Sequence, residues 1–136
     1  MTLNDRNQKI VDEFRANEGR VGGGFQGAPL LLLHTRGAKT GAERVNPMMY
    51  LDLEGRRYVF ASKGGADTHP DWYGNLVTHP DVTYEVGTET VPATAIPVEE
   101  PERTKVYTEQ ETRYPGFREY REKTERVIPV VELVAA

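Results

Sequence analysis

The chain has 136 residues, of which 38% are hydrophobic and 28% charged, and its formal net charge is −4. These values predict one soluble domain with a core large enough to fold unaided, and the acidic balance argues against nucleic-acid binding. No apolar run approaches the roughly 18 residues of a membrane-spanning helix, and the absence of cysteine excludes disulfides, thiolate catalysis and cysteine-bound metals.

The first predicted element is an amphipathic helix over residues 4–16. The glycines at residues 22–24 are expected to end it and to begin a loop. Residues 1–23 are therefore expected to form an N-terminal helix and loop within a single domain of residues 1–136. The first residues show no secretion signal, so we expect a cytoplasmic protein.

Three strands are predicted next. Residues 29–35 form a short apolar run bounded by breakers, and residues 46–53 and 57–62 show strand-like patterns. The segment at residues 36–44 is predicted to be a loop or hairpin connection. Glu54-Gly55 is typical of a tight turn between paired strands.

A short helix is predicted at residues 71–77, with Thr68 or His69 as its cap and Pro70 in its first turn. The remaining elements are predicted to be strands at residues 82–86, 90–98 and 127–134, and helices at residues 99–112 and 115–124.

Pro92 and Pro97 suggest that the fifth strand lies at a sheet edge, because proline cannot donate to a strand ladder. Six strands with mostly short connections predict an α+β fold, a largely antiparallel β-barrel with helical additions.

Positive charge is concentrated in one part of the chain. Between Arg36 and Lys63, six Lys or Arg residues face three Asp or Glu residues, which gives +3 and leaves −7 for the rest. A basic zone in an acidic protein suggests an anionic ligand, although a solvated face of paired charges is the alternative. Its loop, R-G-A-K-T-G-A-E-R, offers donors for phosphate or carboxylate groups but is not a P-loop, so an ordinary hairpin remains possible.

Other candidate sites are weaker. The three histidines match no metal-binding spacing, and we expect no metal. Ser62 lies in A-S-K-G-G, which is not a nucleophile motif, and we expect it to form hydrogen bonds rather than covalent intermediates. Tyr114, Phe117 and Tyr120 share one side of a polar helix, which either packs into the core or covers an apolar pocket.

Five motifs in order carry a resemblance to a known family: R-G-A-K-T-G-A-E-R, N-P-M-M-Y, A-S-K-G-G, H-P-D-W-Y-G-N-L and Y-P-G-F-R-E-Y-R-E-K-T-x-R-x-I-P-V-V. From about residue 24 to residue 133, the chain resembles the deazaflavin (F420)-dependent nitroreductase family. The resemblance implies a split β-barrel that binds coenzyme F420, an 8-hydroxy-5-deazaflavin with a phosphate and an oligoglutamate tail.

By this resemblance, the phosphate and the tail are expected at Lys39, Thr40, Gly41 and Arg44. The deazaflavin ring is expected along Asn46, Pro47 and Met48. Further cofactor contacts are expected from Ala61, Ser62, Lys63, Gly64, Trp72 and Asn75.

The resemblance also implies hydride transfer from reduced F420 to a small-molecule acceptor, which is a quinone, an enone or a nitro compound. Ser62, Tyr50 and Tyr120 are the expected catalytic residues, and the expected acceptor pocket is lined by Tyr50, Tyr114, Phe117 and Tyr120. Some family members have tyrosine in place of Phe117, so the reduction of bicyclic nitroimidazoles stays open.

Two alternatives remain, a non-catalytic F420 carrier and, behind it, an FMN-dependent split-barrel oxidoreductase. A monomer and a homodimer are both compatible with the sequence, and the charged N-terminal helix disfavours membrane contact.

Overall fold

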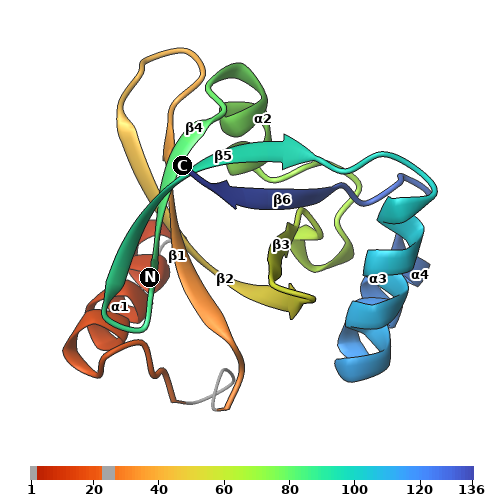
Figure 1. Ribbon diagram of the computed structural model, residues 1–136, viewed down its shortest axis with the longest axis horizontal. Helices are drawn as coiled ribbons and strands as arrows, with labels where there is room; N and C mark the ends of the chain where they lie inside the picture. The colour runs from red at the N-terminus through yellow and green to blue at the C-terminus, as the bar shows by residue number, and fades with distance from the viewer. Residues whose placement is uncertain (1–2, 23–26) are drawn as a thin grey trace.

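The computed structural model describes residues 3–22 and 27–136. Six strands form a closed antiparallel barrel in the order β1-β2-β3-β6-β5-β4 (Figure 1). The strands are β1 (Leu30–Arg36), β2 (Glu43–Leu53), β3 (Arg56–Phe60), β4 (Asp81–Val86), β5 (Glu89–Pro97) and β6 (Val130–Ala135). The helices are α1 (Leu3–Ala16), the 3-10 turn η2 (Lys63–Gly65), α2 (Asp71–Thr78), α3 (Glu102–Arg113) and α4 (Gly116–Lys123). The predicted barrel with added helices is confirmed.

Three apolar clusters hold these elements together. The barrel interior contains alternate residues of the strands, such as Leu31, Leu33 and Val59, and is closed at one end by α2. Helix α1 covers one outer face through Val11 and Phe14. On another side of the barrel, α3 and α4 pack side by side (Figure 1) over a second outer cluster. Among the described residues, no helix is long and apolar enough to cross a bilayer.

Helix α1 ends at the predicted residue, but several residues before the predicted glycine cluster. The helix stops at Ala16, and the chain turns at Glu18 and Gly19, which have φ angles of 57° and 96°. A Cβ on Gly19 would lie 2.8 Å from the Cα of Gly87, so the close approach of this turn to the β4–β5 hairpin requires glycine. The predicted glycine cluster therefore does not end the helix, and its last two members lie outside the described residues.

Two local predictions are wrong. Strand β5 is not an edge, because it pairs with both β4 and β6. Pro92 is tolerated there because its carbonyl accepts from Ala136 N at 2.9 Å, so its imide nitrogen also faces β6, just where that strand ends. At α2, the residue in the cap position is Pro70 and not Thr68 or His69, and no side chain caps the helix.

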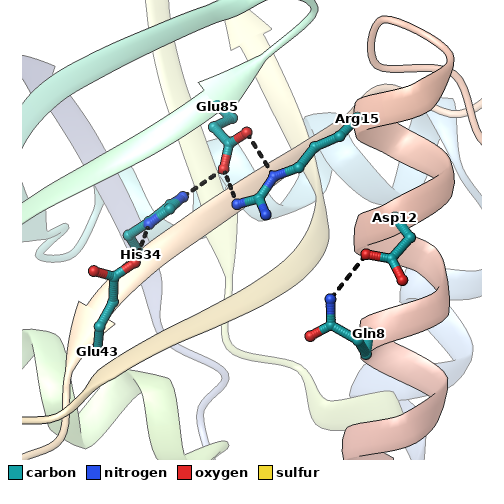
Figure 2. Close-up of polar contacts among 6 residues, drawn as sticks. All are labelled: Gln8, Asp12, Arg15, His34, Glu43 and Glu85. Carbon is teal, nitrogen blue, oxygen red and sulfur yellow. Dashed lines mark hydrogen bonds and ion pairs between the residues drawn. The ribbon is translucent and has the colours of Figure 1, made fainter.

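A charged network fixes α1 to the barrel. Glu85 on β4 accepts two hydrogen bonds from Arg15 on α1 and one from His34 Nε2 at 2.6 Å (Figure 2). His34 Nδ1 lies 2.8 Å from a carboxylate oxygen of Glu43. Because both ring nitrogens of His34 face carboxylates, the form that makes both bonds carries a proton on each nitrogen.

Replacing Glu85 with glutamine should make the free energy of unfolding less dependent on pH in the acidic range. The hydrogen bond from Arg15 holds the pKa of Glu85 below its ordinary value; burial opposes this shift and a second bond, from His34, adds to it. A carboxyl with a lowered folded pKa contributes stability above its unfolded pKa, and this is lost as the pH falls through the folded value. Denaturant unfolding at several pH values below about 5 should show a shallower loss for Glu85→Gln than for the wild type.

The matched control for this experiment is Glu125→Gln, at an exposed residue that forms no ion pair within the described chain. Its acid profile should follow the wild type. Identical profiles for all three proteins would show that the contacts of Glu85 do not contribute to stability.

Candidate functional site

One half of β2 has a free edge. Residues 43–49 pair with β1, whereas among the described residues only 50–53 pair with β3. At about 3.4 Å per residue, this leaves roughly 20 Å of strand edge open. Proline fits such an edge, where it interrupts no ladder. The predicted cofactor residues Asn46, Pro47 and Met48 lie together on this edge, and all three are half-buried.

The basic loop between β1 and β2 is held in place by α2. The side-chain oxygen of Asn75 accepts a hydrogen bond from Ala38 N at 3.0 Å, and its nitrogen donates to Thr35 Oγ1 at 3.3 Å. Asn75 and Thr35 are both buried. The amide of Asn75 is thus used within the protein, and its role in the predicted site is to hold the loop that carries Lys39 and Thr40.

Four exposed cations lie near the end of β1, the start of β2 and the end of β3. Because β1 and β3 both run antiparallel to β2, these termini face the same end of the barrel, called the rim here, although β3 ends beside Tyr50 near the middle of β2. Of the six cations counted in the sequence, Arg56 and Arg57 form ion pairs at the opposite end of β3. The other four form no ion pair within the described residues: Arg36, Lys39, Arg44 and Lys63. The solvated face of paired charges is therefore disfavoured, and the rim is suited to an anionic ligand.

The segment after β3 has an unusual backbone. Ser62 is right-handed helical, with φ −75° and ψ −35°, whereas Lys63 and Gly64 have φ angles of 47° and 63°. A positive φ is uncommon for a residue such as lysine. A right-handed residue followed by a left-handed one turns successive N–H groups into one concavity, called a nest, which binds anions. Residues 61–66, named here the 61–66 loop, thus have the backbone of an anion site.

The 61–66 loop packs against α4. A Cβ on Gly65 would lie 2.8 Å from the carbonyl oxygen of Tyr120 and 3.0 Å from the Cβ of Lys123, whereas a Cβ on Gly64 would meet nothing within 4 Å. The two glycines therefore serve different needs. Gly65 permits contact with α4, and Gly64 leaves the outer side of the loop open. Tyr120, a predicted catalytic residue, adjoins the predicted cofactor loop.

The predicted aromatic stripe is part of the packed cluster beneath α3 and α4. The ring of Phe117 lies edge-on to Phe60 at 5.6 Å and to Tyr120 at 5.2 Å, measured between centroids. Phe117 is buried, and Tyr114 and Tyr120 are half-buried. Because Phe60 directly precedes the 61–66 loop, this cluster is continuous with the predicted cofactor site.

Tyr50, which was also predicted to line the acceptor pocket, does not pack in this aromatic cluster. Successive residues of a strand point to opposite faces, and Tyr50 packs against the barrel interior, where the guanidinium of Arg57 lies 5.7 Å from its ring. Met49 is one of three residues of β2 that pack in the aromatic cluster, together with Leu51 and Leu53. The sequence analysis missed Met49, although its spacing from Leu51, on the same face, was a usable signal.

Trp72 is placed largely inside the barrel. Its side chain is 8% exposed and packs in the interior cluster together with Leu76 of the same helix. Ala61 is also fully buried in this cluster. These two residues close the end of the barrel beneath the rim, where the predicted cofactor site lies.

Two pockets of the structure lie away from this rim. One, of about 530 Å³, is lined by α3 and α4 residues including Arg103 and Arg121. The other, of about 470 Å³, lies at the opposite end of the barrel and is lined by Tyr50, Arg57 and residues of the β4–β5 turn. Neither contains a residue from the basic loop or the 61–66 loop. The unpaired edge of β2, the four free cations and the nest define the candidate site instead.

Known proteins match this chain over most of its length. A sequence model of the family described as F420H(2)-dependent quinone reductase matches residues 6–134. An F420H(2)-dependent quinone reductase of Mycobacterium tuberculosis (strain ATCC 25618 / H37Rv) is 38% identical over 124 residues, covering 88% of this chain and 83% of that protein.

Solved structures agree. A structure described as an F420-H2 dependent reductase, FDR-A, matches with a TM-score of 0.70 at 38% identity, covering 77% of this chain and 93% of that one. A second, described as a domain-swapped dimer, matches with a TM-score of 0.73 at 32% identity and covers 97% and 99% of the two chains.

Proposed function

Because this chain belongs to the F420H(2)-dependent quinone reductase family, we propose that it transfers a hydride from reduced coenzyme F420 to a quinone. The single observation that carries the proposal within this structure is the rim itself. Four unpaired cations, a nest of backbone N–H groups and an open strand edge lie at one end of the barrel. The cofactor is long and anionic at one end, and these features match it in length and in charge.

The fit to F420 is better than the fit to a compact flavin. Lys39 and Arg44 of the basic loop, together with Lys63, provide more positive charge free of ion pairs among the described residues than one phosphate group needs. The oligoglutamate tail adds carboxylates that such a spread of cations stabilises. Asn46 and Met48, on the free edge of β2, are then the residues available to the ring.

When bound, the reduced deazaflavin supplies the hydride from its ring carbon C5. The task of this chain is to hold the acceptor close to that carbon and to stabilise the negative charge that develops on it. Ser62 carries the hydroxyl of the 61–66 loop, and it makes no side-chain capping bond to η2. Tyr120 adjoins the loop, and Tyr114 is half-buried against the same aromatic cluster; we assign both to the acceptor pocket.

The replacement of Ser62 with alanine tests this assignment. Loss of a hydrogen-bond donor to the developing charge should lower kcat/KM for a quinone on the order of 100-fold. The affinity for oxidised F420 should change little, since the cations and backbone donors remain. Oxidation of F420H2 by a soluble quinone, followed through the fluorescence of the deazaflavin, measures the rate.

Thr112→Ala is the control, because it removes a hydroxyl that bonds only to the Thr108 carbonyl on the exposed side of α3. It should retain the wild-type rate. If the wild-type chain bound F420 tightly but transferred hydride no faster than the free cofactor, the proposed enzymatic activity would be rejected. A non-catalytic F420 carrier would then be supported.

A further inference from the structure

Arg126 lies between α4 and β6, outside every helix and strand. Its guanidinium donates through Nε to Ala66 O at 2.7 Å, through Nη1 to Ala61 O at 3.1 Å and through Nη2 to Ser62 O at 2.8 Å. Nη1 also lies 2.9 Å from His69 Nδ1. Among the described residues Arg126 forms no ion pair. Its donors are directed at backbone carbonyls of one loop.

This contact fixes the direction of the peptide groups in the 61–66 loop. In a trans peptide, the carbonyl of one residue and the N–H of the next point in opposite directions. The carbonyls of Ala61 and Ser62 face Arg126, so the N–H groups of Ser62 and Lys63 point away from it. These are the N–H groups that open the nest.

The same connection holds the loop at both ends. Ala61 N donates to Pro129 O at 2.9 Å, and Thr124 Oγ1 donates to a side-chain oxygen of Asp67 at 3.1 Å. Gly65 adds close contact with α4, as described above. Arg126 is the only member of this set that contacts the 61–66 loop at three carbonyls among the described residues.

Resting on the proposed function, we infer that Arg126 is a positioning residue for the cofactor. It holds three carbonyls of the 61–66 loop behind the turn and thereby presents the backbone N–H groups at Ser62 and Lys63 to the anionic or carbonyl groups of F420. Its positive charge, which forms no ion pair within the part of the chain that the structure describes, also favours an anionic ligand.

His69 completes the arrangement. Arg126 donates to His69 Nδ1, so the imidazole accepts there and carries its proton on Nε2. Burial, and then the charge of Arg126, lower the pKa of His69 from its ordinary value. Both effects favour the neutral imidazole of His69, which is the form that can accept a hydrogen bond from Arg126.

The test combines a cofactor-free readout with a binding readout. In Arg126→Gln without cofactor, hydrogen exchange measured by mass spectrometry should be about tenfold faster at residues 62–66 than in the wild type. The Kd for F420 should rise by about 10- to 100-fold, because backbone donors displaced by an ångström lose their alignment. Arg118→Gln removes one exposed charge from α4 and should change neither quantity.

Arg126→Lys separates geometry from charge. Lysine keeps the positive charge but cannot reach three carbonyls and an imidazole from one nitrogen, so we expect the exchange and affinity of the glutamine variant. Added methylguanidinium should restore affinity to Arg126→Gln and leave the affinity of Arg118→Gln at the wild-type value.

Wild-type exchange and wild-type affinity in folded Arg126→Gln or Arg126→Lys would overturn the inference. Failure of the wild-type chain to bind F420 would instead overturn the proposed function, and the exchange result would still decide whether Arg126 orders the loop.

Discussion

Asn75→Ala should lower the free energy of unfolding by about 2 kcal/mol, because it leaves the buried Thr35 hydroxyl and the Ala38 N–H without their partner. It should also weaken F420 binding about tenfold, equivalent to about 1.4 kcal/mol, because the loop carrying Lys39 loses its anchor. Denaturant unfolding and fluorescence titration measure the two effects.

The control for this variant is Asn17→Ala, which removes an exposed side-chain bond to the Glu13 carbonyl at the end of α1. This substitution should lower the free energy of unfolding by less than about 0.5 kcal/mol and leave the affinity for F420 unchanged. If Asn75→Ala lost stability but kept its affinity, the basic loop would not need α2 to bind F420, and this part of the account would be wrong.

Gly65→Ala is the second substitution with a large expected effect. Its φ of 85° is strained for alanine, and the added Cβ would lie 2.8 Å from the backbone oxygen of Tyr120. Strain and overlap together should lower the free energy of unfolding by about 3 kcal/mol. Because relief requires the 61–66 loop to move away from α4, F420 affinity should fall with stability.

Gly64→Ala provides a close comparison at the neighbouring position. Its φ is 63°, but nothing lies within 4 Å of the added Cβ. Only the left-handed conformation is penalised, so the loss of stability should be about 1 kcal/mol. Equal losses for the two variants would show that the loop does not pack on α4 as described.

The barrel was largely predictable because each strand has a local signature. The apolar run at β1 and the turn at Glu54-Gly55 need no information from distant residues, and both were correctly placed. The closure of the barrel was harder to predict from the sequence. From the sequence, Pro92 suggests an edge strand, yet its missing N–H falls beyond the last residue of β6. This position depends on the register between two distant strands.

The site was predictable in outline only. The resemblance named the residues of the basic loop and the 61–66 loop, and charge counting agreed with it. Tyr50 packs against the barrel interior and not with the aromatic residues of α4, whereas the alternation of strand residues places Met49 on the face of the aromatic cluster. Arg126 received no role, because its partners lie about 60 residues away and no spacing rule connects an arginine to backbone carbonyls at that distance.

The most direct test of the central claim is a fluorescence titration of the purified chain with oxidised F420, with FMN as competitor. The account predicts micromolar or tighter F420 binding that weakens as salt screens the four cations of the rim, and no displacement by equimolar FMN. Preferential binding of FMN, or no binding of F420, would contradict the assignment of the rim as a deazaflavin site.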